Sequence, residues 1–439
     1  MKKTTVFLVV LTLVWALAAC GGNNADKQDN ANPAGETATP DQAAEQVTLR
    51  IAWWGSQPRH DYTLKVLQMY ETQHPNVKFE PEYASWDDYW KKLAPEAAAN
   101  ELPDIIQMDL SYIAQYGEKN QLADLTPFIG NAIDTSKISD SVVSGGKIGD
   151  KLYGFNLGVN AVGFHYDPAL LKKATGQDTI DSNWTWDDYV AMAEKAKDAG
   201  LYMDTGMKAD VFFRYYLRTK GKSLFNADGT ALGYDDDQLF VDHFGRLAKL
   251  VNDKAVPTPD IIAQIKGIED DLAVKQQAIG IWQWSNQFVG FQQVANRPLK
   301  MVGMPGPDAS KGLYLKPSMY FSISQNSENK EEAAKFINFF VNDVEANKLI
   351  NGDRGVPGST VVKEALKPAL TPQQAQVFDY IAWAEQNSSQ MDAPDPIGTG
   401  EVIAALEDLT QQLNFGKITA EEAAKQFRTK ANAILAKNK

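Results

Sequence analysis

The sequence predicts an α/β protein with two domains, each a central sheet flanked by helices. Short β-rich segments alternate with helical patterns over residues 47–108, which is typical of a parallel sheet with helices on its faces. The stretch after residue 45 has about 400 residues, more than a single core usually organises. The chain has one cysteine, so its stability must come from its cores and not from disulfides, and a chain of this length can build them.

The first domain follows this alternation element by element. We expect, in chain order, a strand, a helix, a strand, a helix and a strand at residues 47–54, 61–74, 77–83, 86 onward and 104–108. Ser85 and Asp88 have the spacing of a capping box, which marks the start of the second helix.

The rest of the chain continues with β-like segments and then becomes helical. We expect β structure at residues 152–166, 278–284, 299–303 and 320–324. Asp167 followed by Pro168 predicts a helix start, and Thr185 predicts another one that ends near Gly200. The C-terminal helical patterns lie at residues 330–341, 373–384, 401–413 and 420–435.

The N-terminal residues are typical of a secretory signal. Lys2 and Lys3 precede an apolar stretch at residues 6–17, which is too short for a permanent membrane span. The next residues, Leu17 to Cys20, resemble the bacterial lipobox, in which the cysteine is acylated and becomes the mature N-terminus. The alternative is an incidental thiol behind an ordinary cleavage site. Residues 21–45 contain no large apolar residue and predict a flexible tether.

Composition and motifs exclude several classes of function. The formal net charge of -13 argues against binding to nucleic acid, whose phosphates require clustered Lys and Arg. The sequence contains no nucleophile elbow, zinc-protease, phosphate-loop or dinucleotide motif, and its four histidines lack metal-ligand spacing. We therefore expect no catalytic residue, no metal and no cofactor. A glycosidase needs only two carboxylates, so with 56 acidic residues that class stays open.

Aromatic and polar residues gather where the predicted strands end. In doubly wound sheets, ligands bind in the crevice beyond the carboxyl ends of the strands. Indoles at such positions can stack on sugar rings, while polar side chains bind the hydroxyls. The candidate ligand residues are Trp54, Arg59, His60, Trp86, Asp109, Tyr112, Trp282, Trp284, Asn286 and Arg354.

Each aromatic candidate also has a structural alternative. Alternation along a strand points one of Trp53 and Trp54 inward, and we favour Trp54 for the ligand. Trp86 can be an N-terminal packing residue of its helix, and Asp109 can simply cap the following helix. Trp282 and Trp284 share one face of their strand, so both serve the ligand or both serve the core, and we favour the ligand.

Motifs along the whole chain resemble the extracellular solute-binding protein family 1, the sugar-binding lipoproteins of bacterial ABC importers. The markers are residues 53–55, 86–89, 103–106, 185–187, 320–324, 331–336 and 354–357. The resemblance implies a two-lobe periplasmic-binding-protein-like fold (type II), with the sugar held in a cleft between the lobes and no catalysis. It places ligand contacts at Trp54, Arg59, Trp86, Asp109, Trp282, Trp284, Tyr320 and Arg354.

The resemblance also implies a division of the chain and a cellular role. The expected parts are a signal peptide at residues 1–19, a lipidated Cys20 and tether at 20–45, a first lobe at 46–158, a second lobe at 159–320 and a shared helical region at 321–439. Many relatives have proline where Asn156 stands, so the crossing geometry there can differ. Residues 54–60 and 86–89 look most like members that serve plant cell-wall oligosaccharides, including pectin fragments.

The sequence therefore predicts a monomeric protein, lipid-anchored on the extracytoplasmic face of the cell membrane. It would capture a carbohydrate by hinge closure and pass it to the permease subunits of an ABC importer. The alternatives are a lipid-anchored carbohydrate-active enzyme and a binding protein for a non-sugar solute such as a peptide or polyamine.

Overall fold

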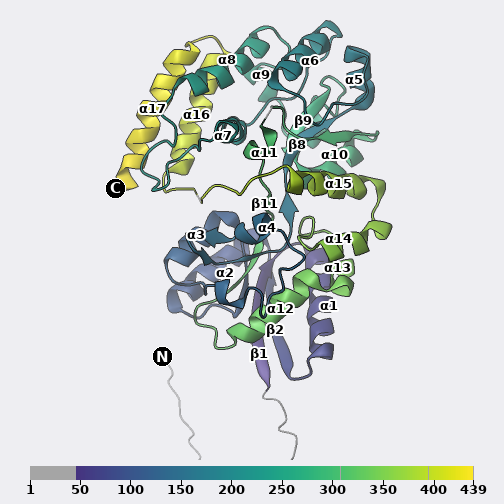
Figure 1. Cartoon of the computed structure of the whole chain (residues 1–439), viewed down its shortest axis with the longest axis vertical. Helices are drawn as coiled ribbons and strands as arrows, with labels where there is room; N and C mark the ends of the chain where they lie inside the picture. Colours follow the sequence, from purple (N-terminus) through teal and green to yellow (C-terminus); the bar gives the residue numbers. More distant parts are fainter. Residues whose placement is uncertain (1–45, 307, 394, 439) are drawn as a thin grey trace, which may run out of the picture. The chain divides into compact units, whose positions relative to one another are not determined.

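Two separate sheets organise the computed structural model, which describes residues 46–306, 308–393 and 395–438. These residues all belong to one compact unit. We call the five-stranded sheet and the helices around it the first lobe, and the three-stranded sheet and its helices the second lobe (Figure 1). The predicted signal peptide, the lipidated Cys20 and the tether lie outside the described residues.

The sheet of the first lobe is mixed. Its strand order is β2 (Val77–Ala84), β1 (Val47–Trp54), β3 (Ile105–Met108), β12 (Tyr320–Ile323) and β6 (Phe155–Asn156). β1 runs parallel to β2 and to β3, as the alternation of strands and helices predicts. The expectation of a parallel sheet fails at β12 and β6. β12 comes from a distant part of the chain and pairs antiparallel with both β3 and β6.

Helices cover the first-lobe sheet on both faces, which explains why the second half of β1 and all of β3 are buried. The helices of this lobe are α1 (Gln57–Gln73), α2 (Trp86–Ala99), α3 (Leu110–Glu118), α4 (Asp140–Ser144), α12 (Lys330–Asn342), α13 (Val344–Ile350) and α14 (Thr360–Leu366). Short elements between them are η1 (Thr126–Phe128), β4 (Lys147–Ile148), β5 (Lys151–Leu152) and η4 (Lys367–Ala369).

The second lobe has an antiparallel sheet of β10 (Lys300–Val302), β8 (Val162–Tyr166) and β9 (Gly280–Trp284). Its helices are α5 (Pro168–Thr175), α6 (Trp186–Asp198), α7 (Ala209–Thr219), α8 (Gln238–Asn252), α9 (Pro259–Ile262), α10 (Phe288–Ala295), α11 (Ala309–Gly312), α15 (Pro372–Gln386), α16 (Thr399–Asn414) and α17 (Ala420–Leu435). Three short turns, η2 (Ile268–Asp270), η3 (Ser285–Gln287) and η5 (Ala436–Asn438), complete it.

The helix starts predicted at Asp167 and Thr185 form as local capping chemistry requires, whereas α1 begins at Gln57, before the expected start at residue 61. Asp167 accepts hydrogen bonds from the backbone N–H groups of Ala169 and Leu170, and Thr185 forms a full capping box with Asp188. At Ser85 the predicted capping box is absent, because the hydroxyl of Ser85 donates to the carboxylate of Asp88 and does not accept from the backbone.

The segments that cross between the lobes pack tightly against one another. β7 (Val159–Asn160) pairs antiparallel with β11 (Lys316–Pro317), and Val159 also bridges to Val356. Gly158 allows this approach, because a Cβ atom at this position would lie 2.2 Å from the carbonyl oxygen of Arg354.

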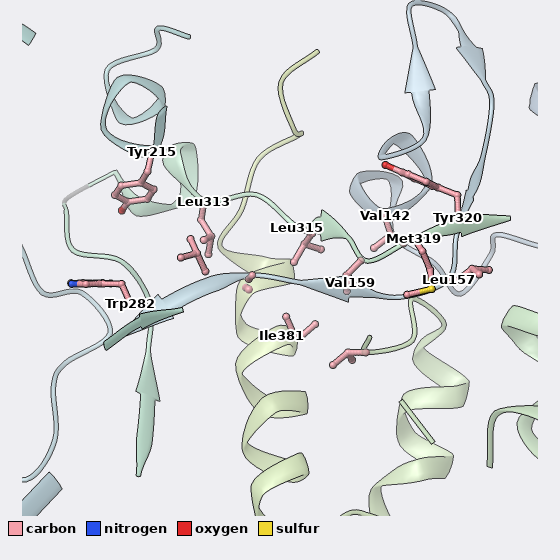
Figure 2. Close-up of a cluster of buried hydrophobic side chains, with 14 of the residues drawn as sticks. Val142, Leu157, Val159, Tyr215, Trp282, Leu313, Leu315, Met319, Tyr320 and Ile381 are labelled. Carbon is pink, nitrogen blue, oxygen red and sulfur yellow. The ribbon is translucent and has the colours of Figure 1, made fainter. Parts of the chain in front are cut away.

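Buried apolar side chains line these crossing segments from one lobe to the other. Figure 2 shows Tyr215 and Trp282 at one end of this cluster, Met319 and Tyr320 at the other, and Ile381 of α15 below the crossing strand. Among the described residues, no helix is long and apolar enough to cross a membrane.

Candidate functional site

Two hollows lie where the first lobe, the second lobe and the crossing segments meet. The first hollow has a volume of about 710 Å³ and is lined by Arg59 and residues 351–356 of the first lobe, Asn160 of a crossing segment, and Asn286 of the second lobe. The second hollow has about 730 Å³ and lies between the start of α3, the start of α7 and residues 391–393 and 395–400. Trp284 and Lys316 line both hollows.

Trp284 and Lys316 form the wall that the two hollows share. Trp284 is the last residue of β9 and is half-buried, and it pairs with Val162 at the end of the second-lobe sheet. The Nζ atom of Lys316 lies 4.9 Å from the centre of its indole ring, a cation–π contact. Among the ion pairs of the described residues, none involves Lys316.

Asn160 is a polar residue inside the wall of the first hollow. It is 6% exposed, and its Oδ1 atom has no hydrogen-bond partner. Asn160 lies opposite Lys316 in the antiparallel ladder of β7 and β11, so the two side chains are on the same face. Sequence reasoning missed both residues. The available signal was a lone asparagine inside the apolar run of residues 157–166.

The loop of residues 351–356 is held in place by the side chain of Arg354. This guanidinium is fully buried and donates to the side chains of Gln107 and, over 3.1 Å, Thr63. The rings of Tyr62, Phe321 and Phe340 lie 5.2 to 5.7 Å from it, so aromatic faces provide the negative potential that a carboxylate would otherwise supply. Arg354 therefore holds the loop that forms a wall of the first hollow by bonding to side chains inside the first lobe.

Arg59 enters the first hollow from α1 with an acidic partner. Its Nε atom lies 2.8 Å from the carboxylate of Asp353, and the hydroxyl of Tyr62 donates to the same carboxylate over 2.8 Å. Burial raises the pKa of Tyr62, which keeps this hydroxyl a donor. Arg59 and Arg354, each predicted as a ligand contact, are both among the residues that line the first hollow.

Residues 388–393 and 395–398, between α15 and α16, form a strap that contributes a wall of the second hollow. Arg218 of α7 donates to Ser389 and to the carbonyl of Gln390, and it pairs with Asp392. Arg214 pairs with Asp395 over 2.9 Å. These bonds from α7 fix the strap on the second lobe.

A separate group of rings lies on the first lobe. We call Trp54, Trp86, Tyr89, Trp90 and Tyr112 the first-lobe aromatic cluster. Trp54 is only 7% exposed and contacts Trp86 edge-on at 4.9 Å between ring centres, whereas Trp86 is 41% exposed. Tyr112 stacks on Trp90 at 4.0 Å. None of these five residues lines either of the two hollows.

Four other predicted ligand residues have partners inside the lobes. His60 is buried and accepts a hydrogen bond from Trp53, and burial lowers its pKa. The carboxylate of Asp109 accepts from the backbone N–H of Ser111, which is the capping alternative. Tyr320 is fully buried and donates to the carbonyl of Gly145.

The fourth is Trp282, which does not share the surroundings of Trp284. It is 6% exposed, stacks on Trp184 and donates to the carboxylate of Asp204 over 2.9 Å. Burial raises the pKa of Asp204. The expectation that Trp282 and Trp284 share one environment fails, because Trp284 lies at the end of the strand, where the sheet stops and the hollows begin.

The site contains no arrangement that points to a metal. Within residues 46–306, 308–393 and 395–438, no group of three or more His, Cys, Asp or Glu side chains could hold a metal ion. The hollows instead offer an indole, amide groups and cationic side chains, which suit a polar organic ligand with flat apolar faces.

The chain matches a known protein family. Residues 55–346 match the family described as bacterial extracellular solute-binding protein. An ABC transporter extracellular-binding protein of Pyrococcus horikoshii is 30% identical over 201 residues, which cover 45% of this chain and 44% of that protein.

Two solved structures share the fold over nearly the whole described chain. The family 1 extracellular solute-binding protein of Alicyclobacillus acidocaldarius is 29% identical, with a TM-score of 0.80 and coverage of 89% of this chain and 99% of that one. A periplasmic oligogalacturonide binding protein of Yersinia enterocolitica is 22% identical, with a TM-score of 0.77 and coverage of 89% and 100%.

Proposed function

Because this chain belongs to the bacterial extracellular solute-binding proteins, we propose that it captures an oligosaccharide between its two lobes and delivers it to an ABC importer. One observation carries the proposal: Trp284 presents a half-buried indole where the two hollows meet. The C–H faces of a sugar ring stack on an indole, and sugar hydroxyls need donors and acceptors nearby. Asn160 and Asn286 line the same hollow and supply them.

Capture of the ligand requires contacts from both lobes. The first hollow has Arg59 and the loop 351–356 on one side and Trp284 and Asn286 on the other. A ligand shifts a two-state protein towards its closed form only by binding that form more tightly. We therefore propose that the lobes close about the crossing segments when sugar binds, and that the importer recognises the closed form.

The first-lobe aromatic cluster is a second proposed contact surface. Trp86 is its most exposed ring, and Tyr112 follows Ser111, which lines the second hollow. A sugar chain that extends beyond the second hollow over α3 would meet Tyr112 and then Trp86. We propose that only longer oligosaccharides use this cluster.

We also propose that acylation of Cys20 anchors the protein on the outer face of the cell membrane. The lipobox resemblance supports this proposal, and stable anchoring requires more than one acyl chain. Full-length protein and a Cys20→Ser variant, expressed in a bacterial host and labelled with an alkyne fatty acid, test it. Label and membrane association should be present in the first and absent from the second. Equal membrane association of both would contradict the anchor.

Titration calorimetry against a panel of oligosaccharides tests the proposed function. The panel contains oligogalacturonides, because the Yersinia protein is named for them, together with neutral gluco-, xylo- and galacto-oligosaccharides. We expect at least one class to bind without turnover, and Trp284→Ala to weaken that binding by about 1–3 kcal/mol. Trp383→Ala is the matched control, because Trp383 is a half-buried indole outside both hollows.

The outcomes separate the remaining alternatives. Release of product from any sugar would favour a carbohydrate-active enzyme. No binding to any member of the panel would favour a non-sugar solute. Unchanged affinity in Trp284→Ala, with a melting temperature lowered as in the control, would remove Trp284 from the ligand site.

A further inference from the structure

Within the described residues, Lys316 is the cation of the first hollow whose side chain has neither an ion-pair nor a hydrogen-bond partner, and its charge therefore bears on the charge of the ligand. Arg59 is paired with Asp353, and the guanidinium of Arg354 is turned into the first lobe, where Gln107 accepts from it. No ion pair of the described residues involves Lys316, which is only half exposed. The ammonium group is therefore available to a ligand that enters the hollow.

The position of Lys316 disfavours a neutral sugar on the face of the Trp284 ring that the ammonium group covers. Its Nζ atom lies 4.9 Å from the centre of the Trp284 ring and covers one face of the indole. A neutral sugar that stacks on this face must displace the ammonium group and lose the cation–π contact. A sugar with a carboxylate can stack there and give the displaced ammonium group a hydrogen-bonded ion pair in return.

Asn160 adds a second, independent observation. Its Oδ1 atom is buried in the wall of the first hollow without a hydrogen-bond partner, on the same ladder face as Lys316. Buried acceptors are normally satisfied, so this oxygen is suited to receive a donor from a ligand. A uronic acid unit offers both groups, a carboxylate for Lys316 and hydroxyl donors for Asn160.

The charges of the second hollow restrict where the carboxylate lies. The strap carboxylates of Asp392 and Asp395 are paired with Arg218 and Arg214, but Asp210 in the first turn of α7 has no ion-pair partner among the described residues. A second carboxylate in this hollow would lie near the charge of Asp210 and be repelled. The charge of Asp210 therefore favours the Asn160 side of Trp284 for the carboxylate that Lys316 would bind.

From these contacts, and resting on the proposed function, we infer that the ligand is an acidic oligosaccharide. One uronic acid unit lies against Trp284 in the first hollow, its carboxylate accepts from the Nζ atom of Lys316, and one of its hydroxyls donates to the Oδ1 atom of Asn160. Lys316 is the residue that distinguishes acidic from neutral sugars.

Matched pairs of sugars test this inference. Trigalacturonic acid is compared with the α-1,4-linked galactotriose that carboxyl reduction produces from it, and a glucuronic acid oligomer with its reduced glucose counterpart. We expect one acidic sugar to bind about ten- to a hundredfold more tightly than its reduced form, the range of a hydrogen bond to a charged group. Added salt should weaken binding of the acidic sugar and leave the neutral one nearly unchanged.

Three variants assign the effect to Lys316. Lys316→Met should remove the preference for the acidic sugar, while neutral sugars bind as before or more tightly. Retained binding of the neutral sugars would also show that the variant is folded. Lys316→Arg should retain most of the preference. Lys311→Met is the matched control, because Lys311 is exposed, lines neither hollow and carries the same charge a few residues away.

Each outcome decides the inference. Equal or tighter binding of a neutral sugar by the parent protein overturns it and leaves the proposed function standing. A preference for acidic sugars that survives Lys316→Met, or is lost equally in Lys311→Met, overturns the role of Lys316. Failure to bind any sugar overturns the proposed function and this inference with it.

Discussion

Acidification from pH 8 to pH 5 should remove about 2 kcal/mol of stability for each of two buried histidines. His165 on β8 and His243 on α8 are fully buried, and no ring nitrogen of either residue has a hydrogen-bond partner. Both rings are surrounded by aromatic side chains, among them Phe288 beside His165 and Phe213 beside His243. Burial lowers the pKa of each histidine from 6.5 to about 3.

The sign follows from the protons that each state binds. Below pH 6.5 the unfolded chain protonates both histidines, whereas in the folded protein they stay neutral until about pH 3. The stability is therefore fully present above pH 6.5 and is lost as the pH falls from 6.5 towards 3. pH 5 lies about 1.5 units below the unfolded pKa, and each unit corresponds to about 1.36 kcal/mol of stability. The expected loss at pH 5 is therefore about 2 kcal/mol per histidine and about 4 kcal/mol for the pair.

Urea unfolding followed by tryptophan fluorescence measures this loss. The free energy of unfolding is determined at pH 8 and pH 5 for the parent protein and for variants with His165→Phe, His243→Phe and both. Because the carboxylates are common to all proteins, their contribution cancels in the difference between parent and variant. The double variant should lose about 4 kcal/mol less than the parent, and each single variant about 2 kcal/mol less. Equal losses in all four proteins would refute the argument and show that the folded protein protonates both rings.

Three further predictions concern residues around the site. Trp282→Phe should lower the free energy of unfolding by about 1–3 kcal/mol, because the buried carboxylate of Asp204 loses a donor, and urea unfolding measures it. Arg354→Ala should lower the free energy of unfolding by about 3 kcal/mol or more, because it leaves a cavity and an unpaired Gln107. Sugar affinity should fall as well. A stable variant with normal affinity would show that Arg354 is not needed to hold the loop 351–356. Trp86→Ala should change the free energy of unfolding by less than about 1 kcal/mol and weaken binding of a hexasaccharide but not of a disaccharide, measured by calorimetry.

Local patterns predicted most secondary structure because the forces that form it are local. The capping residues Asp167 and Thr185, and the β-rich run that became β1, lie within a few residues of the structure they determine. Long-range pairing is different. β12 joins the first-lobe sheet from more than two hundred residues away from β3, and no local pattern shows that it runs antiparallel.

The candidate site was only partly predictable for the same reason. Trp284 could be found because it follows a β-rich run, but Asn160 and Lys316 become neighbours only through the pairing of β7 with β11. Strand alternation failed at Trp53 and Trp54, which are both buried. Helices cover both faces of the first-lobe sheet, so at the end of β1 the side chains on either face are buried.

The two ends of the described chain belong to different lobes. β1 lies in the first-lobe sheet, whereas α17 packs on α8 and α16 in the second lobe (Figure 1). Fluorescent labels placed near Gln46 and Asn438 would therefore travel with different halves of the molecule. Energy transfer between them would report the proposed closure of the lobes as an optical signal.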